Sequence, residues 1–166
     1  MRLKWYENIK RLADILEHLS IRGKDGREIN VEAGFALLKA ATLRIRQKRG
    51  TIFLIGNGAS ASMASHMAAD LAKNALLHTE VFSDLSLITA ISNDMGFENV
   101  FSEPLSRRCR YGDMLVAISS SGESRNVLKA VALAQKKKMS IVTFSAMSPF
   151  NTLRKTGTIN FYVNAK

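Results

Sequence analysis

Cysteine and long hydrophobic runs are scarce in this sequence, and their scarcity excludes several classes of protein. The 166 residues include one cysteine and two prolines, and 7% of them are aromatic. One cysteine cannot form an intrachain disulfide or a zinc site built from several cysteines. Apolar runs such as residues 51–55 and 114–118 are far shorter than the roughly 20 residues of a membrane-spanning helix. We therefore expect a protein of the reducing cytoplasm without a membrane span.

The bulk composition is that of an ordinary globular protein. Hydrophobic residues make up 46% of the chain and charged residues 23%, which is unlike a disordered sequence. The N-terminal residues alternate charged and apolar side chains and lack the apolar core of a secretory signal. A length of 166 residues suits one compact domain, so we expect a single domain over residues 1–166.

Positive charge is in excess, with 24 basic and 14 acidic residues and a formal net charge of +10. Such an excess can attract nucleic acid or another polyanion. Here the tightest basic clusters, at residues 44–49, 107–110 and 136–138, are short and are not interleaved with aromatic residues. Two of them close predicted helices, where cations favour the helix dipole. We interpret the charge as a solvated basic surface and do not expect nucleic acid as a partner.

Hydrophobic periodicity divides the chain into a helical segment over residues 1–50 and an α/β core over residues 51–166. Two helices lead, at residues 2–20 and 31–48, with a polar loop between them. Short apolar runs then alternate with helical stretches, which favours a parallel sheet covered on both faces. Strands are predicted at 51–55, 114–118, 140–144 and 158–163, with weaker candidates at 76–83 and 85–91. Helices are predicted at 59–74, within 93–110 and at 124–138, with a turn or short helix at 149–155.

Two polar loops each follow a buried strand and lead into a helix. The first loop is residues 56–60 (GNGAS), and the second, here called the serine loop, is residues 119–124 (SSSGES). Ligands of parallel sheets bind outside the carboxyl ends of the strands, and a helix N-terminus offers free N–H groups to phosphate. The serine loop adds up to four hydroxyls, which predicts a phosphate site. The alternative is a serine-rich turn in which Ser124 caps the helix.

The first loop also allows a second interpretation. Gly56, Gly58 and Ala61 match a relaxed dinucleotide fingerprint, and Glu80 or Asp84 lies near the position of its acidic residue. A dinucleotide would leave the serine loop without a role, so no nucleotide cofactor is expected. The Gly-Lys-Ser/Thr ending of a P-loop is absent, which argues against a nucleoside triphosphatase.

The helix after the first loop carries one pair of chemically active side chains. His66 and Asp70 are four residues apart and therefore share a helix face. Such a pair can serve as a base with its orienting partner, supply two ligands to zinc, or form an ordinary surface contact. Cys109 lies among arginines that can lower its pKa, but no base is close in sequence, so we interpret it as an ordinary thiol.

Three stretches resemble the sugar-isomerase (SIS) domain family, and within it most closely the phosphoheptose isomerases. They are GNGASASMASHMAADL at 56–71, ISNDMGFENVF at 91–101 and GDMLVAISSSGESRNVLKA at 112–130. The resemblance implies a three-layer αβα sandwich with a parallel sheet, similar to flavodoxin and Rossmann folds and preceded by N-terminal helices. It also implies a homo-oligomer, a tetramer or dimer, with sites built between subunits.

The resemblance further implies roles for individual residues. The substrate-binding positions would be Asn57, Gly58 and Ser60 in the first loop, Asn93 and Asp94 in a sugar-contacting loop, and Ser119, Ser120, Ser121 and Ser124 in the serine loop. Asp70 would take part in proton transfer, and His66 with Asp70 would help to hold a zinc ion. The substrate would be a phosphorylated sugar, sedoheptulose 7-phosphate in the relatives.

Some positions depart from the family pattern. Asp70 stands where the family has glutamate, and its carboxylate is about 1 Å short, which can cost about 100-fold in rate. Ala59 replaces a glycine, and Glu123 brings an anion into the serine loop, tolerable only if it points away. The family continues beyond the last strand into a helix with a Gln and a His, whereas this sequence ends at Lys166. We expect the face left by that helix to be apolar and covered by a neighbouring subunit.

Three functions are compatible with these features. The first is aldose–ketose isomerisation of a sugar phosphate, through an enediol and with Asp70 as a proton-transfer group. The second is a sugar-phosphate sensor without catalysis, and the third is a partner of the bacterial replication initiator. The shortened carboxylate favours the two binding functions, and the serine loop is compatible with all three.

Overall fold

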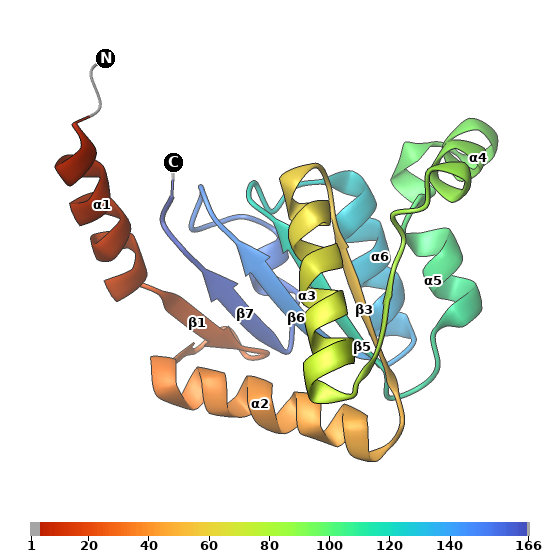
Figure 1. The fold of residues 1–166 in the computed structure, drawn as a ribbon, viewed down its shortest axis with the longest axis horizontal. Helices are drawn as coiled ribbons and strands as arrows, with labels where there is room; N and C mark the ends of the chain where they lie inside the picture. Colours follow the sequence, from red (N-terminus) through yellow and green to blue (C-terminus); the bar gives the residue numbers. More distant parts are fainter. Residues whose placement is uncertain (1–3, 166) are drawn as a thin grey trace.

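The computed structural model describes residues 4–165, which form one seven-stranded sheet with helices on both faces (Figure 1). The order of the strands across the sheet is β2-β1-β7-β6-β5-β3-β4. Their bounds are β1 Ser20–Gly23, β2 Glu28–Ile29, β3 Thr51–Gly56, β4 His78–Val81, β5 Met114–Ser119, β6 Ser140–Ser145 and β7 Ile159–Tyr162. The five strands from β7 to β4 are parallel, as predicted, whereas β1 and β2 run antiparallel to their neighbours.

Helices α2 to α6 pack on the two faces of this sheet as the αβα prediction requires, whereas α1 does not pack on it. The α-helices are α1 Trp5–Glu17, α2 Val31–Gln47, α3 Ala59–Ala75, α4 Leu85–Met95, α5 Ser102–Arg108 and α6 Arg125–Lys136, and the 3-10 turns are η1 Phe97–Asn99 and η2 Leu153–Lys155. Successive side chains of β3 point to opposite faces of the sheet and join both helix layers. Ile52 and Leu54 pack with α2 and α3, while Phe53 and Ile55 pack with α4, α5 and α6. No described helix is both long and apolar enough to cross a membrane.

Two local predictions were wrong. The segment between α1 and α2, expected as a loop, is the β1–β2 hairpin, whose turn carries Asp25 and Gly26. An Asp-Gly pair is a hairpin signal, and burial of Ile21 fixes the hairpin to the sheet. The weak strand candidate at 85–91 is helix α4, whose first turn is capped by the carboxylate of Asp84 accepting from the N–H of Leu87 at 2.9 Å.

A buried arginine attaches the hairpin to the rest of the sheet. The Arg154 side chain, only 4% exposed, donates to Ser20 and Glu28 of the hairpin and to the carbonyl of Pro149 at 2.8 Å. Its guanidinium also stacks over the ring of Tyr162, with 4.1 Å between the guanidinium carbon and the ring centroid. Burial lowers the pKa of Arg154, and its Nε has no hydrogen-bond partner among the described residues.

Apolar surface remains uncovered in two places on one side of the molecule. Helix α1 leans away from the sheet in Figure 1 and has no buried residue, although Trp5, Tyr6 and Leu16 are large and apolar. Beside it an open groove of about 280 Å³ crosses the ends of β6 and β7. Its apolar lining includes Leu19, Phe35, Met63, Ile118, Phe144 and Phe161. The described residues of one chain thus leave an apolar face open; that this is the face of the family's C-terminal helix, and that a second subunit covers it, stays a prediction.

Candidate functional site

The first loop and the serine loop lie next to each other at the carboxyl edge of the sheet. They follow β3 and β5, which are paired in parallel with Gly56 beside Ile118. Each loop leads directly into a helix, α3 or α6, whose N-terminal N–H groups face that edge. This is the position at which parallel sheets bind ligands. The geometry therefore places together the two loops that the sequence singled out.

Hydrogen bonds among its own hydroxyls shape the serine loop. The Ser119 hydroxyl is buried and lies 3.2 Å from that of Ser124 and 3.5 Å from that of Ser121. The same Ser119 oxygen accepts from the N–H of Gly122 at 3.2 Å. Ser124 is the residue directly before α6, and its side chain makes no capping hydrogen bond to the helix. The cluster holds several donors on one small loop, as a phosphate monoester requires.

The loop is also fixed from outside, and Glu123 does not disturb it. The carboxylate of Glu123 accepts from the N–H and the hydroxyl of Thr152, at 2.7 and 2.9 Å, so it is held against the turn before η2. Gly122 has a φ of +67°, and a Cβ there would meet the Asn151 side chain at 2.1 Å. Glycine is therefore required at position 122. The Glu123 carboxylate is bound by Thr152 and points away from the serine hydroxyls, which is the condition under which an anion is tolerable in this loop.

An asparagine pair joins the two loops, and only Asn57 of this pair was predicted from the sequence. Asn57 donates to the Asn126 side-chain oxygen at 3.0 Å, and Asn126 donates back to Asn57 at 2.9 Å. The Asn126 oxygen also accepts from the N–H of Val127 in the first turn of α6. Asn126 is 3% exposed. Its only signal in the sequence was a polar residue two positions after the serine loop, where helix surfaces are usually polar.

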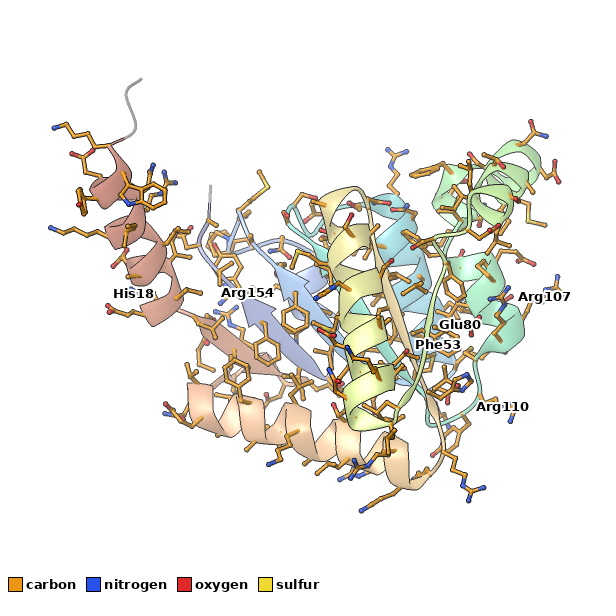
Figure 2. All side chains as sticks on the ribbon, in the orientation of Figure 1. His18, Phe53, Glu80, Arg107, Arg110 and Arg154 are labelled. Atoms are coloured by element: carbon orange, nitrogen blue, oxygen red, sulfur yellow. The ribbon has the colours of Figure 1, made fainter. Side chains whose placement is uncertain are left out.

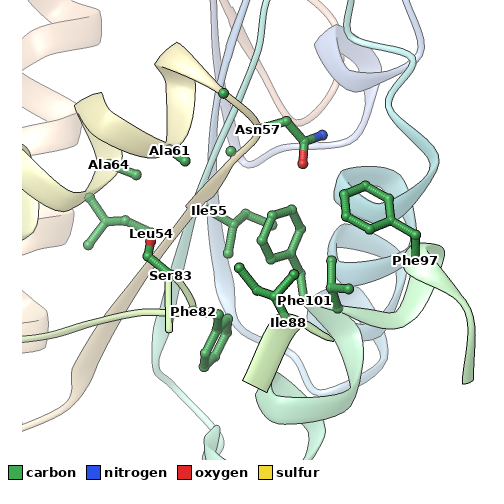
Figure 3. A pocket seen from close by; sticks show the side chains of 13 residues that line it. Leu54, Ile55, Asn57, Ala61, Ala64, Phe82, Ser83, Ile88, Phe97 and Phe101 are labelled. Carbon is green, nitrogen blue, oxygen red and sulfur yellow. The ribbon is translucent and has the colours of Figure 1, made fainter. Parts of the chain in front are cut away.

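Two cavities meet at Asn57. One, of about 230 Å³, opens between β3, α3 and η1 and is lined by apolar side chains such as Ile55, Phe97 and Phe101 (Figure 3). The other, of about 330 Å³, lies over the start of α6 and is lined by Asn57, Phe97, Glu98, Ser124, Arg125 and Asn126. Arg125 and Glu98 were not singled out from the sequence. Arg125 supplies a cation beside the serine loop, where a phosphate would be attracted.

The remaining predicted sugar contacts are placed differently. Ser60 and Ser120 face the open groove together, on the other side of the two loops. Asn93 and Asp94 lie in the last turn of α4 and not in a loop, and the Asn93 amide donates to Asp94 at 2.9 Å. Asp94 lines a separate cavity between α4 and α5. Within one chain the structure does not bring these two residues to the serine loop.

His66 and Asp70 form the expected pair, but away from the loops. Their Nε2 and Oδ2 atoms are 3.3 Å apart, and their side chains are 83% and 50% exposed. Asp70 lies eleven residues after the start of α3, about 16 Å along the helix axis at 1.5 Å per residue. No group of three or more metal-binding side chains occurs among residues 4–165. The pair therefore offers two ligands, whereas a zinc site needs three or four.

The single cysteine is not activated. Burial raises the pKa of the Cys109 thiol, and the nearby Lys137 opposes that rise only in part. The arginines beside it in sequence do not lower its pKa; Arg107 instead pairs with Glu103 at 2.9 Å. The interpretation as an ordinary thiol agrees with this environment.

Comparison with known proteins identifies the family. The sequence profile of the SIS domain matches residues 27–146, which is most of the chain. The chain belongs to the SIS domain family. This SIS domain is 37% identical to the phosphoheptose isomerase of Neisseria gonorrhoeae over 135 residues, 76% of this chain and 67% of that protein. It is 40% identical to the phosphoheptose isomerase of Rhodospirillum rubrum over 99 residues, and spans about half (53%) of that relative's length.

Solved structures agree with this assignment. A phosphoheptose isomerase from Neisseria gonorrhoeae superimposes with a TM-score of 0.80 and 30% identity, over 98% of this SIS domain and 83% of that chain. A phosphoheptose isomerase from Francisella tularensis superimposes with a TM-score of 0.81 at 22% identity, over 97% and 82% of the two chains, and supports the fold. The resemblance stated from three sequence stretches is thereby confirmed.

Proposed function

We propose that this SIS domain binds a phosphorylated sugar at the carboxyl edge of its sheet and acts as an aldose–ketose isomerase of the phosphoheptose isomerase type. The observation that carries the proposal is the hydroxyl cluster of Ser119, Ser121 and Ser124, held beside Asn57 by the asparagine pair. Two relatives that are 40% and 37% identical over the aligned residues are named phosphoheptose isomerases, which points to the same substrate class.

In this proposal the serine loop holds the phosphate and the rest of the sugar extends toward Asn57. Hydroxyls and helix N-terminal N–H groups donate to the phosphate oxygens, and Arg125 adds a positive charge beside them. Isomerisation moves a proton between the carbonyl carbon and the carbon next to it, through an enediol. A carboxylate is suited to accept and return that proton, and Asp70 is the proposed group.

In this proposal Asp70 reaches a bound sugar across a subunit boundary. It is about 16 Å along α3 from the loops of its own chain and half-exposed, so another chain's loops can approach it. Uncovered α1 and the open groove supply the apolar surface that such an assembly would bury. We therefore propose a homo-oligomer, with a tetramer implied by the resemblance, that works in the cytoplasm.

Zinc is a proposed cofactor of the same site. His66 and Asp70 are adjacent on one helix face and would supply an imidazole nitrogen and a carboxylate oxygen, both ordinary zinc ligands. The other ligands would come from outside residues 4–165 of this chain. Bound zinc would polarise the sugar carbonyl.

A non-catalytic sugar-phosphate sensor is the second candidate, favoured by one observation. Asp70 is shorter than the family's glutamate and touches neither loop in its own chain, so binding can persist without proton transfer.

Calorimetry with sedoheptulose 7-phosphate, and an isomerisation assay on the same samples, test both candidates. Ser121→Ala is expected to weaken binding about tenfold, since it removes a donor to a charged group. Ser106→Ala, on α5, is the matched control and should bind as the wild type does. Sedoheptulose without phosphate should bind far more weakly. Equal binding of the two sugars would contradict the phosphate assignment.

Variants of Asp70 separate enzyme from sensor. Asp70→Asn should abolish turnover and leave binding within about twofold, whereas Asp70→Glu should retain or raise turnover. An exposed ion pair contributes little to stability, so both variants should fold. Binding without turnover in the wild type, with and without zinc, would favour the sensor.

A further inference from the structure

The three basic clusters of the sequence converge at one edge of the sheet. Lys48 and Arg49 follow α2 and precede β3, Arg108 and Arg110 end and follow α5 before β5, and the cluster at 136–138 closes α6 before β6. Strands β3, β5 and β6 are neighbours in the sheet and run parallel. Because all three clusters precede parallel strands, they share the amino edge, opposite the serine loop. In Figure 2, Arg110 lies at the lower right of the molecule, on the side where β3 begins in Figure 1.

Part of this edge is concave. A cleft of about 460 Å³, here called the amino-edge cleft, opens between the starts of β3, β4 and β5. Its lining includes Lys48, Arg49, Glu80, Arg108, Arg110 and Asp113. The ring of Tyr111 is 81% exposed at this cleft. The volume falls within the range of small-molecule sites.

The carboxylates of the cleft are already engaged, whereas most of its cations are not. Glu80 pairs with Arg108. Asp113 is buried and accepts from the backbone N–H of Thr51 at 2.9 Å and of Arg110 at 2.7 Å. The side chains of Lys48, Arg49 and Arg110 form no ion pair with any residue between 4 and 165. Three unpaired cations therefore face one cavity.

The helix dipole alone does not explain this arrangement. Cations favour helix C-termini, and that accounts for Lys48 at the end of α2. It does not account for Arg110, which lies beyond the end of α5, in the connection to β5, and lines the cleft from there. Arg49 has a φ of +52°, in a position after a helix where glycine is the usual residue. A guanidinium is present there despite the backbone conformation.

We propose that the amino-edge cleft binds a small molecule that carries two or more linked phosphate groups. Guanidinium groups bind phosphate oxygens in pairs, and three unpaired cations suit several linked phosphates better than one. The ligand is either an inorganic oligophosphate or a nucleotide, whose base would stack on the exposed ring of Tyr111. The site is independent of the sugar site proposed at the opposite edge of the sheet.

Calorimetric titration with inorganic triphosphate, and separately with ATP, tests the proposal. The wild type should bind triphosphate with a dissociation constant below 1 mM in 50 mM salt, and more weakly in 200 mM salt. The double variant Arg49→Gly/Arg110→Gln should bind about 100-fold more weakly, about tenfold for each lost cation. This variant should fold, because glycine accepts the positive φ and Arg110 contacts Asp113 through its backbone only.

A matched control and two further arms make the outcome decisive. Lys39→Gln/Lys129→Gln removes the same charge from the exposed middle of α2 and α6, and should bind triphosphate within twofold of the wild type. Tyr111→Ala should weaken ATP alone if the ligand is a nucleotide, and neither ligand if it is an inorganic oligophosphate. The proposal is overturned if the wild type fails to bind triphosphate, or if the control loses as much affinity as the cleft variant. Tighter binding of a single-stranded 20-mer oligonucleotide, weakened equally by both double variants, would instead reveal an open nucleic-acid surface.

Discussion

The asparagine pair between the two loops should be energetically coupled. Asn126→Ala removes two amide–amide hydrogen bonds and the acceptor of the Val127 N–H, all at a side chain that is 3% exposed. At about 1 kcal/mol for each net hydrogen bond, the free energy of unfolding should fall by about 2–3 kcal/mol. Asn57→Ala loses the two mutual bonds and leaves the Asn126 amide unpaired, so it should cost about 2 kcal/mol.

Urea unfolding of the wild type, both single variants and the double variant gives the coupling directly. Since the mutual bonds can be lost only once, the two changes should not add, and the coupling energy should be about 1–2 kcal/mol. A coupling below about 0.3 kcal/mol would refute the reasoning, because distant sites add within roughly that margin. Both single variants should also weaken sugar-phosphate binding, whereas Asn99→Ala, a half-buried control on η1, should not.

Other perturbations test the hairpin and helix α1. Arg154→Met should lower the free energy of unfolding, measured in urea, by about 2–4 kcal/mol, because it removes charged hydrogen bonds from a buried site. The control Lys155→Met, at the exposed neighbouring residue, should change that free energy by less than about 0.5 kcal/mol. Equal effects of the two variants would contradict the role of Arg154 in holding the hairpin. Burial alone would raise the pKa of Glu28, but hydrogen bonds from Arg22 and Ser20 outweigh it and lower that pKa. Its stabilisation is thus present above the usual glutamate pKa and lost as pH falls through the lowered one, so the stability gap between wild type and Glu28→Gln should shrink from pH 6 to pH 3; a constant gap would argue against it. Leu12→Glu, on the uncovered helix α1, should give a lighter species in sedimentation than the exposed control Lys10→Glu; identical masses would exclude α1 from the interface.

The parallel part of the sheet was predictable because its signals are local. Buried runs such as residues 51–55 and 114–118 become β3 and β5, and the loops that follow them meet because parallel strands end at one edge. The sequence thus predicted that both loops lie at the carboxyl edge of the sheet, and the strand order, which was not predicted, sets them side by side.

What could not be predicted depends on partners distant in sequence. The hairpin is stabilised by pairing with β7 and by Arg154, more than 130 residues away from Ser20 along the chain. Asn126 looks like any polar helix residue until Asn57 lies against it. In the sequence, the basic clusters could be explained as the ends of helices. Two of them share a cleft only because β3 and β5 are neighbours in the sheet.

The pairing of the β1–β2 hairpin with β7 has a consequence for the order of folding. On the ribosome, Ile21 and the edge of β1 that faces β7 are made early, but their partner strand, Ile159–Tyr162, is made more than a hundred residues later. Contacts of such long sequence separation form slowly, and an unpaired strand can join another chain in the meantime. The far edge of the sheet is therefore the last to close during synthesis, and the nascent chain is most prone to aggregate before β7 emerges.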